Sequence, residues 1–467
     1  MPNSAGRPLG TTPDAGPLDA GTAPPGAVVG AAGAGGGDTG GVDGGITAGG
    51  SAAGASASPP RRRGPVRRRA SIVALLGPAF VAAVAYVDPG NVAANLTSGA
   101  TYGYLLVWVL VAANAVAVLV QYQSAKLGIV TGRSLPELLG DRLSPWPRRA
   151  FWVQAELVAL ATDLAEVVGG AIALQLLFGV PLPLGGAIVG LVSMGVLLVQ
   201  TRHGQRSFER VVVGLLAVIT LGFLTGLVVS PPDAGGVVGG LVPRFEGAQS
   251  VLLAASMLGA TVMPHAVYVH SALSRDRHHA QRDTDVVLRA TRIDVGGALA
   301  VAGAVNIGML LLAAATLGGV EGTDTIAGAH AAIVSALGPV VGVLFAVGLL
   351  ASGLASTSVG SYAGAVIMGG LLHLRIPLLA RRALTLVPAI GLLAAGADPT
   401  WALVISQVVL SFGIPFAVIP LVGYTGRRSL MGRYRDPVVT RVLAWTAVAL
   451  IVALNVVLLW LTFTGVA

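Results

Sequence analysis

From residue 72 onward, long apolar segments alternate with short polar segments that carry most of the charged residues. Eleven apolar segments follow one another, and most reach the ~20 residues that a helix needs to cross ~30 Å of hydrocarbon. The pattern predicts an all-α polytopic membrane protein, with a further short helix outside the membrane over residues 325–338. The expected bounds of the eleven segments are 72–96, 104–127, 151–178, 184–201, 210–230, 249–273, 293–317, 340–372, 381–396, 400–424 and 438–463.

Two of the predicted helices are interrupted by helix-breaking residues. The first contains Tyr86-Val87-Asp88-Pro89-Gly90-Asn91, and the sixth contains Ala260-Thr261-Val262-Met263-Pro264-His265. A break at membrane depth frees backbone carbonyls, which only protein or a bound ligand can satisfy there. Each broken helix opens a group of five, and an odd number of spans separates equivalent positions in the two groups. We therefore predict two inverted repeats, residues 71–230 and 249–425, followed by an eleventh helix over 438–463.

The first break combines oxygen atoms that suit a cation. Asp88 and Asn91 are three residues apart, so even a partly helical turn is expected to point both oxygen ligands the same way. Unwinding at Pro89-Gly90 would also free the carbonyl of Ala85 or of its neighbours. Carboxylate, amide and carbonyl oxygens make a cation site. The alternative is a kinked helix whose acid is paired with a neighbouring base.

Met263, at the second break, favours a transition metal. A thioether beside hard oxygens favours a borderline or soft divalent ion such as Mn²⁺ or Fe²⁺ over Ca²⁺ or Mg²⁺. Methionine is also a common core filler, but its place directly before Pro264 supports a ligand. Gln407 in the tenth helix is a further candidate ligand among polar residues that otherwise bridge helices. The chain has no cysteine, which excludes thiolate sites.

Two histidines follow the second break. His265 comes directly after the proline, and His270 lies five residues further on. An imidazole near a carboxylate in a hydrated cavity is able to relay protons, because its ordinary pKa of about 6.5 lies in the physiological range. The alternative for both is a hydrogen bond to a backbone carbonyl at the break.

The third predicted helix carries three acids on one stripe. Glu156, Asp163 and Glu166 are spaced seven and three residues apart, and acids on one face of a membrane helix must meet bases or water. Arg381 and Arg382, at the start of the ninth helix, are the candidate partners. The stripe is interpreted either as a proton exit path to the cytoplasm or as an ion-pair network between two helices, and both roles are compatible.

Composition supports a membrane protein, and charge predicts its orientation. Hydrophobic residues make up 54% of the 467 residues, and the mean hydropathy is +0.80, outside the range of soluble domains. All but Arg244 of the 29 lysine and arginine residues lie in the first 70 residues or in alternate loops, which is the positive-inside pattern. The net charge of +8 thus indicates topology and contact with anionic lipid. We expect a multi-pass plasma-membrane protein with a cytoplasmic amino terminus and an extracellular carboxy terminus.

Residues 1–70 differ from the rest of the chain. Gly, Ala, Pro, Ser and Thr dominate them, and such a segment cannot bury enough apolar surface to offset the entropy of ordering. We predict a disordered cytoplasmic tail. Its arginine runs could suggest a secretory signal, but the tail is too long and Asp88 interrupts the following apolar stretch.

With these residues in view, the chain resembles the Nramp family of proton-coupled divalent metal transporters from about Ser71 to Ala467. The motifs that carry the resemblance are Asp88-Pro89-Gly90-Asn91, Asp163-Leu164-Ala165-Glu166-Val167, Gly259-Ala260-Thr261-Val262-Met263-Pro264-His265, Arg381-Arg382 and Ser406-Gln407-Val408-Val409-Leu410-Ser411-Phe412. The chain departs from the family at Leu354, where members often have glutamine, so no polar role is expected there.

The resemblance implies a LeuT-like 5+5 inverted-repeat fold of eleven transmembrane helices, with helices one and six discontinuous. It implies import of Mn²⁺, Fe²⁺ and related ions such as Co²⁺ and Cd²⁺, with H⁺ as the coupling ion. The implied metal ligands are Asp88, Asn91, Met263, the carbonyls of Ala85 and Ala260, and Gln407. The implied proton pathway contains Asp88, His265, Glu156, Asp163, Glu166, Arg381 and Arg382, and to these we add His270 from its position.

Other functions fit the sequence less well. A carrier of organic substrates with the same architecture would hold a carboxylate at a half-helix amino terminus, which an anionic Asp88 would oppose. An intramembrane metal-dependent enzyme would need clustered ligands and a positioned water, and a channel would not need a closed site with a soft ligand. We expect no enzymatic activity, no prosthetic group and no nucleic-acid partner; the expected partners are divalent metal ions, protons and the lipid bilayer.

Overall fold

The computed structural model describes residues 77–278, 283–323, 325–374 and 376–464, and the predicted tail over residues 1–70 lies outside these ranges. The described chain is helical with short connections. The uninterrupted long helices are α3 (Val107–Thr131), α5 (Pro145–Phe178), α6 (Leu182–His203), α7 (Gln205–Val229), α11 (Thr284–Thr316), α13 (Pro339–Leu372), α14 (Leu378–Ala394), α15 (Pro399–Thr425) and α17 (Val438–Thr464).

Two spans are broken at the predicted places. The first consists of α1 (Pro78–Val84), the 3₁₀ turn η2 (Ala85–Val87) and α2 (Pro89–Tyr102). The second consists of α9 (Gly247–Thr261) and α10 (Pro264–His278). Each of the eleven predicted segments therefore corresponds to one helix or, in the first and sixth, to a broken helix.

Length and composition alone identify fewer spans than eleven. Within the described residues, eight helical segments are long and apolar enough to cross a membrane, and a ninth is formed if the second half of α15 is joined to the bent segment that follows it. The interrupted first span and the 17 residues of α14 account for most of the difference. The chain is an all-helical multi-span membrane protein.

Several helices extend beyond their predicted bounds. α5 begins at Pro145 rather than at 151, and α11 begins at Thr284 rather than at 293. Asp283 caps α11 by accepting a hydrogen bond from the backbone N–H of Val286 at 3.2 Å. Hydropathy locates the apolar part of a helix, whereas a polar cap determines where the helix begins.

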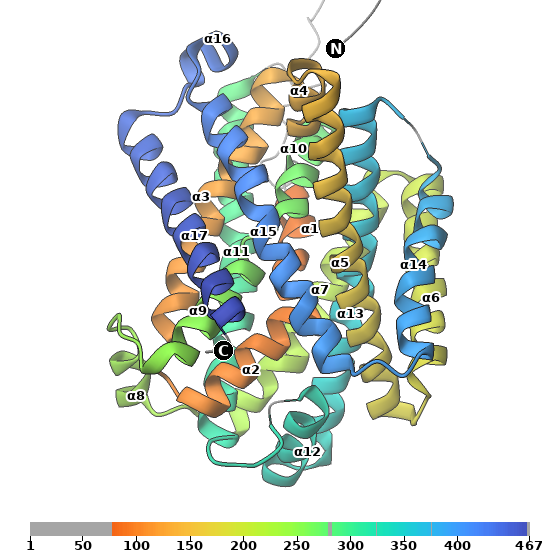
Figure 1. Cartoon of the computed structure of the whole chain (residues 1–467), viewed down its shortest axis with the longest axis vertical. Helices are drawn as coiled ribbons and strands as arrows, with labels where there is room; N and C mark the ends of the chain where they lie inside the picture. Colours follow the sequence, from red (N-terminus) through yellow and green to blue (C-terminus); the bar gives the residue numbers. More distant parts are fainter. Residues whose placement is uncertain (1–76, 279–282, 324, 375, 465–467) are drawn as a thin grey trace, which may run out of the picture. The chain divides into compact units, whose positions relative to one another are not determined.

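Short helices mark the two ends of the bundle. α4 (Leu135–Arg142) and α16 (Arg428–Met431) lie at one end, which we call the α4 end. α8 (Ala234–Gly239) and α12 (Ile326–Leu337) lie at the opposite end, called the α12 end (Figure 1). α12 confirms the short helix predicted over residues 325–338.

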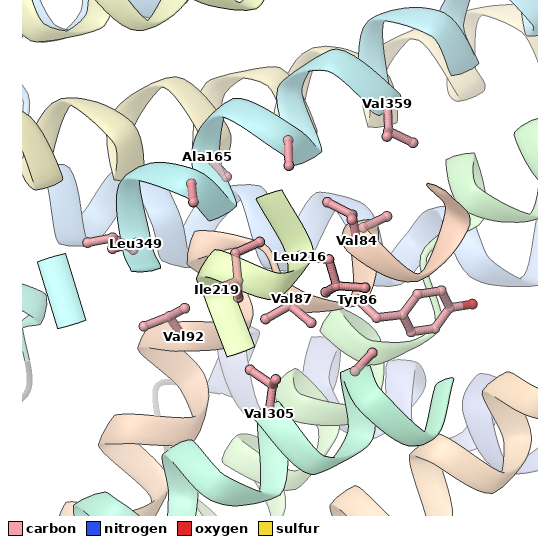
Figure 2. Packing of buried hydrophobic residues seen from close by; sticks show 14 of the residues in the cluster. Val84, Tyr86, Val87, Val92, Ala165, Leu216, Ile219, Val305, Leu349 and Val359 are labelled. Carbon is pink, nitrogen blue, oxygen red and sulfur yellow. The ribbon is translucent and has the colours of Figure 1, made fainter. Parts of the chain in front are cut away.

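The first break lies within the hydrophobic core. Val84, Tyr86 and Val87 are buried among apolar side chains from α5, α7, α11 and α13 (Figure 2). Each of the three is at most 1% exposed. The irregular backbone of this break is therefore buried in protein, which is where an interrupted helix is tolerated at membrane depth.

Candidate metal site

The first break is organised by Asp88, which caps α2. Its backbone is extended (φ −79°, ψ 167°), and its Oδ1 accepts hydrogen bonds from the backbone N–H and the Nδ2 of Asn91, both at 2.7 Å. Pro89 follows at the first helical position, where its missing N–H costs nothing. The two side chains therefore lie against each other, with Asn91 facing Asp88 through its Nδ2; that both direct an oxygen toward a cation stays a prediction.

Asn91 also joins the two broken helices. Its Nδ2 donates a second hydrogen bond, at 2.9 Å, to the carbonyl oxygen of Ala260 near the end of α9. The chain then turns through Val262 (φ −99°, ψ 77°), and Pro264 opens α10. Met263 lies between the two helices and is fully buried. The fold thus brings the two predicted breaks together.

Asp88 and Asn91 each keep one buried side-chain oxygen that has no hydrogen-bond partner among the described residues. These oxygens are Asp88 Oδ2 and Asn91 Oδ1. Among the described residues, Asp88 forms no ion pair. The structure therefore does not contain the alternative arrangement, a kinked helix whose acid is paired with a neighbouring base. Buried polar atoms without partners are costly, and a bound cation is the kind of partner that carboxylate and amide oxygens accept.

Gln407, the candidate ligand from the tenth helix, reaches the same place from α15. A Cβ atom at Gly90 would overlap its carboxamide. The carboxamide lies beside the Asp88 carboxylate without a well-formed hydrogen bond to it. Glycine at position 90 therefore leaves the space that this carboxamide occupies.

The donor set at the junction is mixed. Among the described residues, no group of three or more His, Asp or Glu side chains is arranged to hold a metal ion. A cation at this junction must therefore use amide, carbonyl or thioether donors beside the single carboxylate, and such a set differs from that of hydrolytic zinc sites.

Two carbonyl oxygens of η2 are bound by side chains that the sequence analysis did not select. Asn306 on α11 donates from Nδ2 to the Tyr86 carbonyl at 2.7 Å, and Ser352 on α13 donates to the Val87 carbonyl. Ala85, the predicted carbonyl ligand, opens η2 and is fully buried. The only available signal for Asn306 and Ser352 was their polarity within apolar helices, which usually indicates helix packing.

The two histidines have different surroundings. His265 Nδ1 is 3.5 Å from the hydroxyl of Thr162 on α5, one residue before Asp163. His270 Nδ1 is 2.7 Å from Gln121 Oε1 on α3, and Gln121 Nε2 donates to the Tyr86 hydroxyl at 2.6 Å. His270 is thus linked through α3 to the first break and not to the α5 acids. Neither ring is bonded to a backbone carbonyl in the described residues, in contrast to the alternative considered above.

The acids of α5 meet the predicted arginines of α14. Arg382 Nη1 is 3.0 Å from Asp163 Oδ1, and these side chains are 0% and 1% exposed. Their atoms are close but poorly aligned for a hydrogen bond, since Arg382 directs its Nε to Ser193 instead. Arg381 pairs with Glu156, which is 18% exposed. The predicted ion pairing between the two helices is confirmed.

Glu166 lies further along the same stripe. Its Oε1 accepts a hydrogen bond from Ser356 on α13, and its Oε2 has no partner among the described residues. A Cβ atom at Gly360 would lie 3.3 Å from Glu166 Oε2 and 3.6 Å from Asp163 Oδ1. Glycine at this position leaves space beside two neighbouring carboxyl groups.

Known proteins resemble the chain over most of its length. It is 58% identical over 396 residues to the divalent metal cation transporter MntH of Mycobacterium tuberculosis (strain H37Rv), covering 84% of this chain and 92% of the relative. A crystal structure of the manganese transporter of Eremococcus coleocola, in complex with an aromatic bis-isothiourea substituted compound, is 33% identical with a TM-score of 0.76. That match covers 82% of this chain and 85% of the other.

A more distant match identifies the fold alone. MhsT in complex with L-phenylalanine is 15% identical with a TM-score of 0.55, covering 83% of this chain and 99% of the other. The predicted LeuT-like fold is thereby confirmed. The family profile described as natural resistance-associated macrophage protein-like, Nramp, matches residues 79–461. The chain therefore belongs to the Nramp family.

Proposed function

We propose that the chain imports divalent transition-metal ions, Mn²⁺ or Fe²⁺ and related ions, together with protons, by alternating access. The observation that supports this most directly is the pair of buried, unpartnered oxygens, Asp88 Oδ2 and Asn91 Oδ1, where the two broken helices meet. Relatives named as a divalent metal cation transporter and a manganese transporter support the same class of substrate.

In this proposal the substrate ion is held by both breaks. Asp88 supplies the charge, Asn91 the amide oxygen and Met263 the thioether. The carbonyls of Ala85 and Ala260 and the side chain of Gln407 complete the shell in different conformations. A thioether is a poor ligand for Mg²⁺ and Ca²⁺, so Met263 would provide the selectivity.

Protons would enter the same cycle through Asp88. Metal binding favours the ionised carboxylate, so the ion would displace a proton from Asp88. His265 lies beside α5, and the route continues along Asp163, Glu166 and Glu156. Arg381 and Arg382 would keep part of this stripe ionised. His270 would act from the other side of the break, through Gln121.

Charge supports an orientation for this cycle. The connections at the α4 end carry the arginines of the alternate loops, and this end would face the cytoplasm. Residues 71–230 and 249–425 would then form two repeats of opposite orientation, with the helix over 438–463 ending outside. A negative membrane potential would add about 2.3 kcal/mol per charge per 100 mV to the import of cations.

The fold alone does not choose the substrate, because MhsT shares it and is seen with L-phenylalanine. The donor set does. An amino-acid carboxylate at the first break would lie beside Asp88, and like charges at low dielectric repel. The relatives are named as transporters, so an enzyme is not proposed.

Uptake of Mn²⁺ and, separately, of Mg²⁺ into proteoliposomes with an internal pH dye tests the proposal. We expect saturable Mn²⁺ uptake with acidification, lost in Asp88→Asn. Met263→Ala should admit Mg²⁺. Met257→Ala is the matched control, because Met257 is equally buried but lies within α9, where its sulfur accepts a hydrogen bond from Ser98 at 3.0 Å. An absence of metal flux in the unsubstituted protein would contradict the proposal and favour an organic substrate.

A further inference from the structure

A cavity of about 690 Å³ opens at the α4 end, away from the candidate metal site. It lies where the first turn of α1 meets the start of α7 and the end of α10. Its lining combines three arginines with two apolar side chains and one acid: Arg206, Arg210, Arg277, Phe80, Val213 and Glu209, beside the backbone of Gly77.

The charge of this cavity is positive. Glu209 is already engaged, since Arg277 lies 3.7 Å away and Gln205 Nε2 donates to it at 2.8 Å. Arg206 and Arg210, both exposed, form no ion pair with a carboxylate among the described residues. Arg210 donates only to the Ser207 hydroxyl and, more weakly, to the backbone carbonyl of Arg206. Two guanidinium groups thus remain to bind an anion.

The start of α1 is not the anion site. Its N–H groups at Gly77 and Ala79 both donate to the carboxylate of Asp294 on α11, at 3.0 Å each. A protein carboxylate already fills the position that an anion would take at this helix terminus. An anion in the cavity must therefore bind on the α7 side.

Val213, which lines the cavity, also belongs to an exposed apolar face of α7. Val213, Val218 and Leu221 lie on one exposed face of α7, pointing away from the core. Phe80 is half-buried and reaches α11, where a Cβ atom at Gly297 would lie 3.9 Å from its ring. Ile293, also on α11, is exposed. An aliphatic chain that leaves the arginines would therefore run over apolar side chains between α7 and α11.

We propose that this cavity binds an anionic phospholipid from the leaflet at the α4 end. Arg206 and Arg210 hold the headgroup phosphate, and one acyl chain packs along Val213 and Phe80. A soluble phosphate would use the arginines but not the apolar wall. Basic pockets between transmembrane helices take acidic lipid headgroups by this combination of charge and apolar contact. The assignment of this leaflet to the cytoplasmic side rests on the proposed orientation. The proposed lipid binding does not depend on that orientation.

From this position a bound lipid would affect how α1, α7 and α11 pack together. It would contact α7 through its headgroup and α1 through Phe80, and α1 leads directly into the break that carries Asp88. The Asp294 carboxylate holds α1 to α11 on the other side. A bound lipid would therefore favour the conformation in which α1, α7 and α11 are packed together.

Native mass spectrometry of the purified full chain in neutral detergent, without metal, tests the proposal. Phosphatidylglycerol is titrated against phosphatidylcholine, and the variants are the doubles Arg206→Gln/Arg210→Gln and Arg428→Gln/Arg433→Gln. The second double removes the same charge at the same end but outside the cavity. The first should bind phosphatidylglycerol about 30-fold more weakly, from the usual contribution of an arginine near an anionic lipid surface. The second should bind normally.

One further variant and two competitors distinguish a bound phospholipid from a bound soluble phosphate. Arg206→Lys/Arg210→Lys should retain binding, which excludes misfolding as the cause of any loss. Glycerol 3-phosphate and inorganic phosphate should not compete at concentrations where phosphatidylglycerol is bound. Equal losses in the two glutamine doubles, or competition by either soluble phosphate, would overturn the lipid site. Because no transport is measured, these outcomes are independent of whether the chain carries metal.

Discussion

The pair formed by Asp163 and Arg382 allows a quantitative test of what holds α5 to α14. Two opposite charges 3.0 Å apart attract by about 5.5 kcal/mol at an effective dielectric constant of about 20. Both side chains are almost completely removed from solvent, so desolvation offsets much of this attraction. Removing one partner, however, leaves the other charge buried and unpaired, at a cost of about 3–5 kcal/mol.

We therefore expect Arg382→Gln to lower the free energy of unfolding by about 3–5 kcal/mol. In that variant Asp163 lies near Glu166 with no arginine opposite it. The double variant Arg382→Gln/Asp163→Asn removes both charges, and it should recover at least about 2 kcal/mol of the loss. The exposed pair of Arg433 with Asp285 is the control, and its double-mutant cycle should show no measurable coupling.

Unfolding titrations with sodium dodecyl sulfate in mixed micelles, followed by circular dichroism, supply the four free energies of each cycle. A buried double variant that loses as much stability as the two single variants together would contradict this expectation. In that case the two charges act independently, and α5 and α14 are held by their apolar contacts. Metal uptake by the same variants then shows whether the pair serves transport in addition to stability.

Three further substitutions test other parts of the molecule. Gly90→Ala places a methyl group on the Gln407 carboxamide, so Mn²⁺ affinity measured by calorimetry should fall at least about tenfold; unchanged affinity would remove Gln407 from the site. Gly222→Ala should cost about 1–3 kcal/mol in the unfolding titration, because its Cβ would lie 2.6 Å from a backbone oxygen of α13, whereas Gly214→Ala, which meets nothing within 4 Å, should cost nothing. Burial raises the pKa of Glu137 on α4, but hydrogen bonds from its arginine and serine partners outweigh this and hold the pKa below its usual 4.5. Its stabilising contribution is therefore complete above pH 4.5 and lost as the pH falls through the lowered value, so melting curves of Glu137→Gln and the unsubstituted protein should differ at neutral pH and converge in acid; parallel curves at every pH would contradict this.

The features that depend on a few neighbouring residues were predictable from the sequence. Proline next to glycine or methionine located both breaks, and the three-residue spacing of Asp88 and Asn91 oriented their side chains. The ion pairs of α5 were predictable because buried acids require bases and Arg381 and Arg382 stood at the matching membrane depth. In each case a few neighbouring residues, or one strong physical requirement, were sufficient.

Contacts between distant segments were not predictable in this way. Asn306 and Ser352 bind carbonyls of η2 from helices more than 200 residues away, and nothing in their local sequence separates them from ordinary packing residues. His270 was placed on the proton route from its position alone, but its partner Gln121 on α3 is determined by how α10 packs. Such partners depend on the tertiary fold.

The hydrogen bonds of Asn91 explain why an amide and not a second acid stands at the first break. Its Nδ2 donates both to Asp88 and to the carbonyl of Ala260, so one side chain fixes the carboxylate and joins the broken helices. The Oδ1 of the same group remains available to a cation. Aspartate would supply the oxygen but not the donors, and it would place a second negative charge beside Asp88. In the proposed cycle, an ion bound to this oxygen would act on both broken helices through one residue, because the same amide group already joins Asp88 to Ala260.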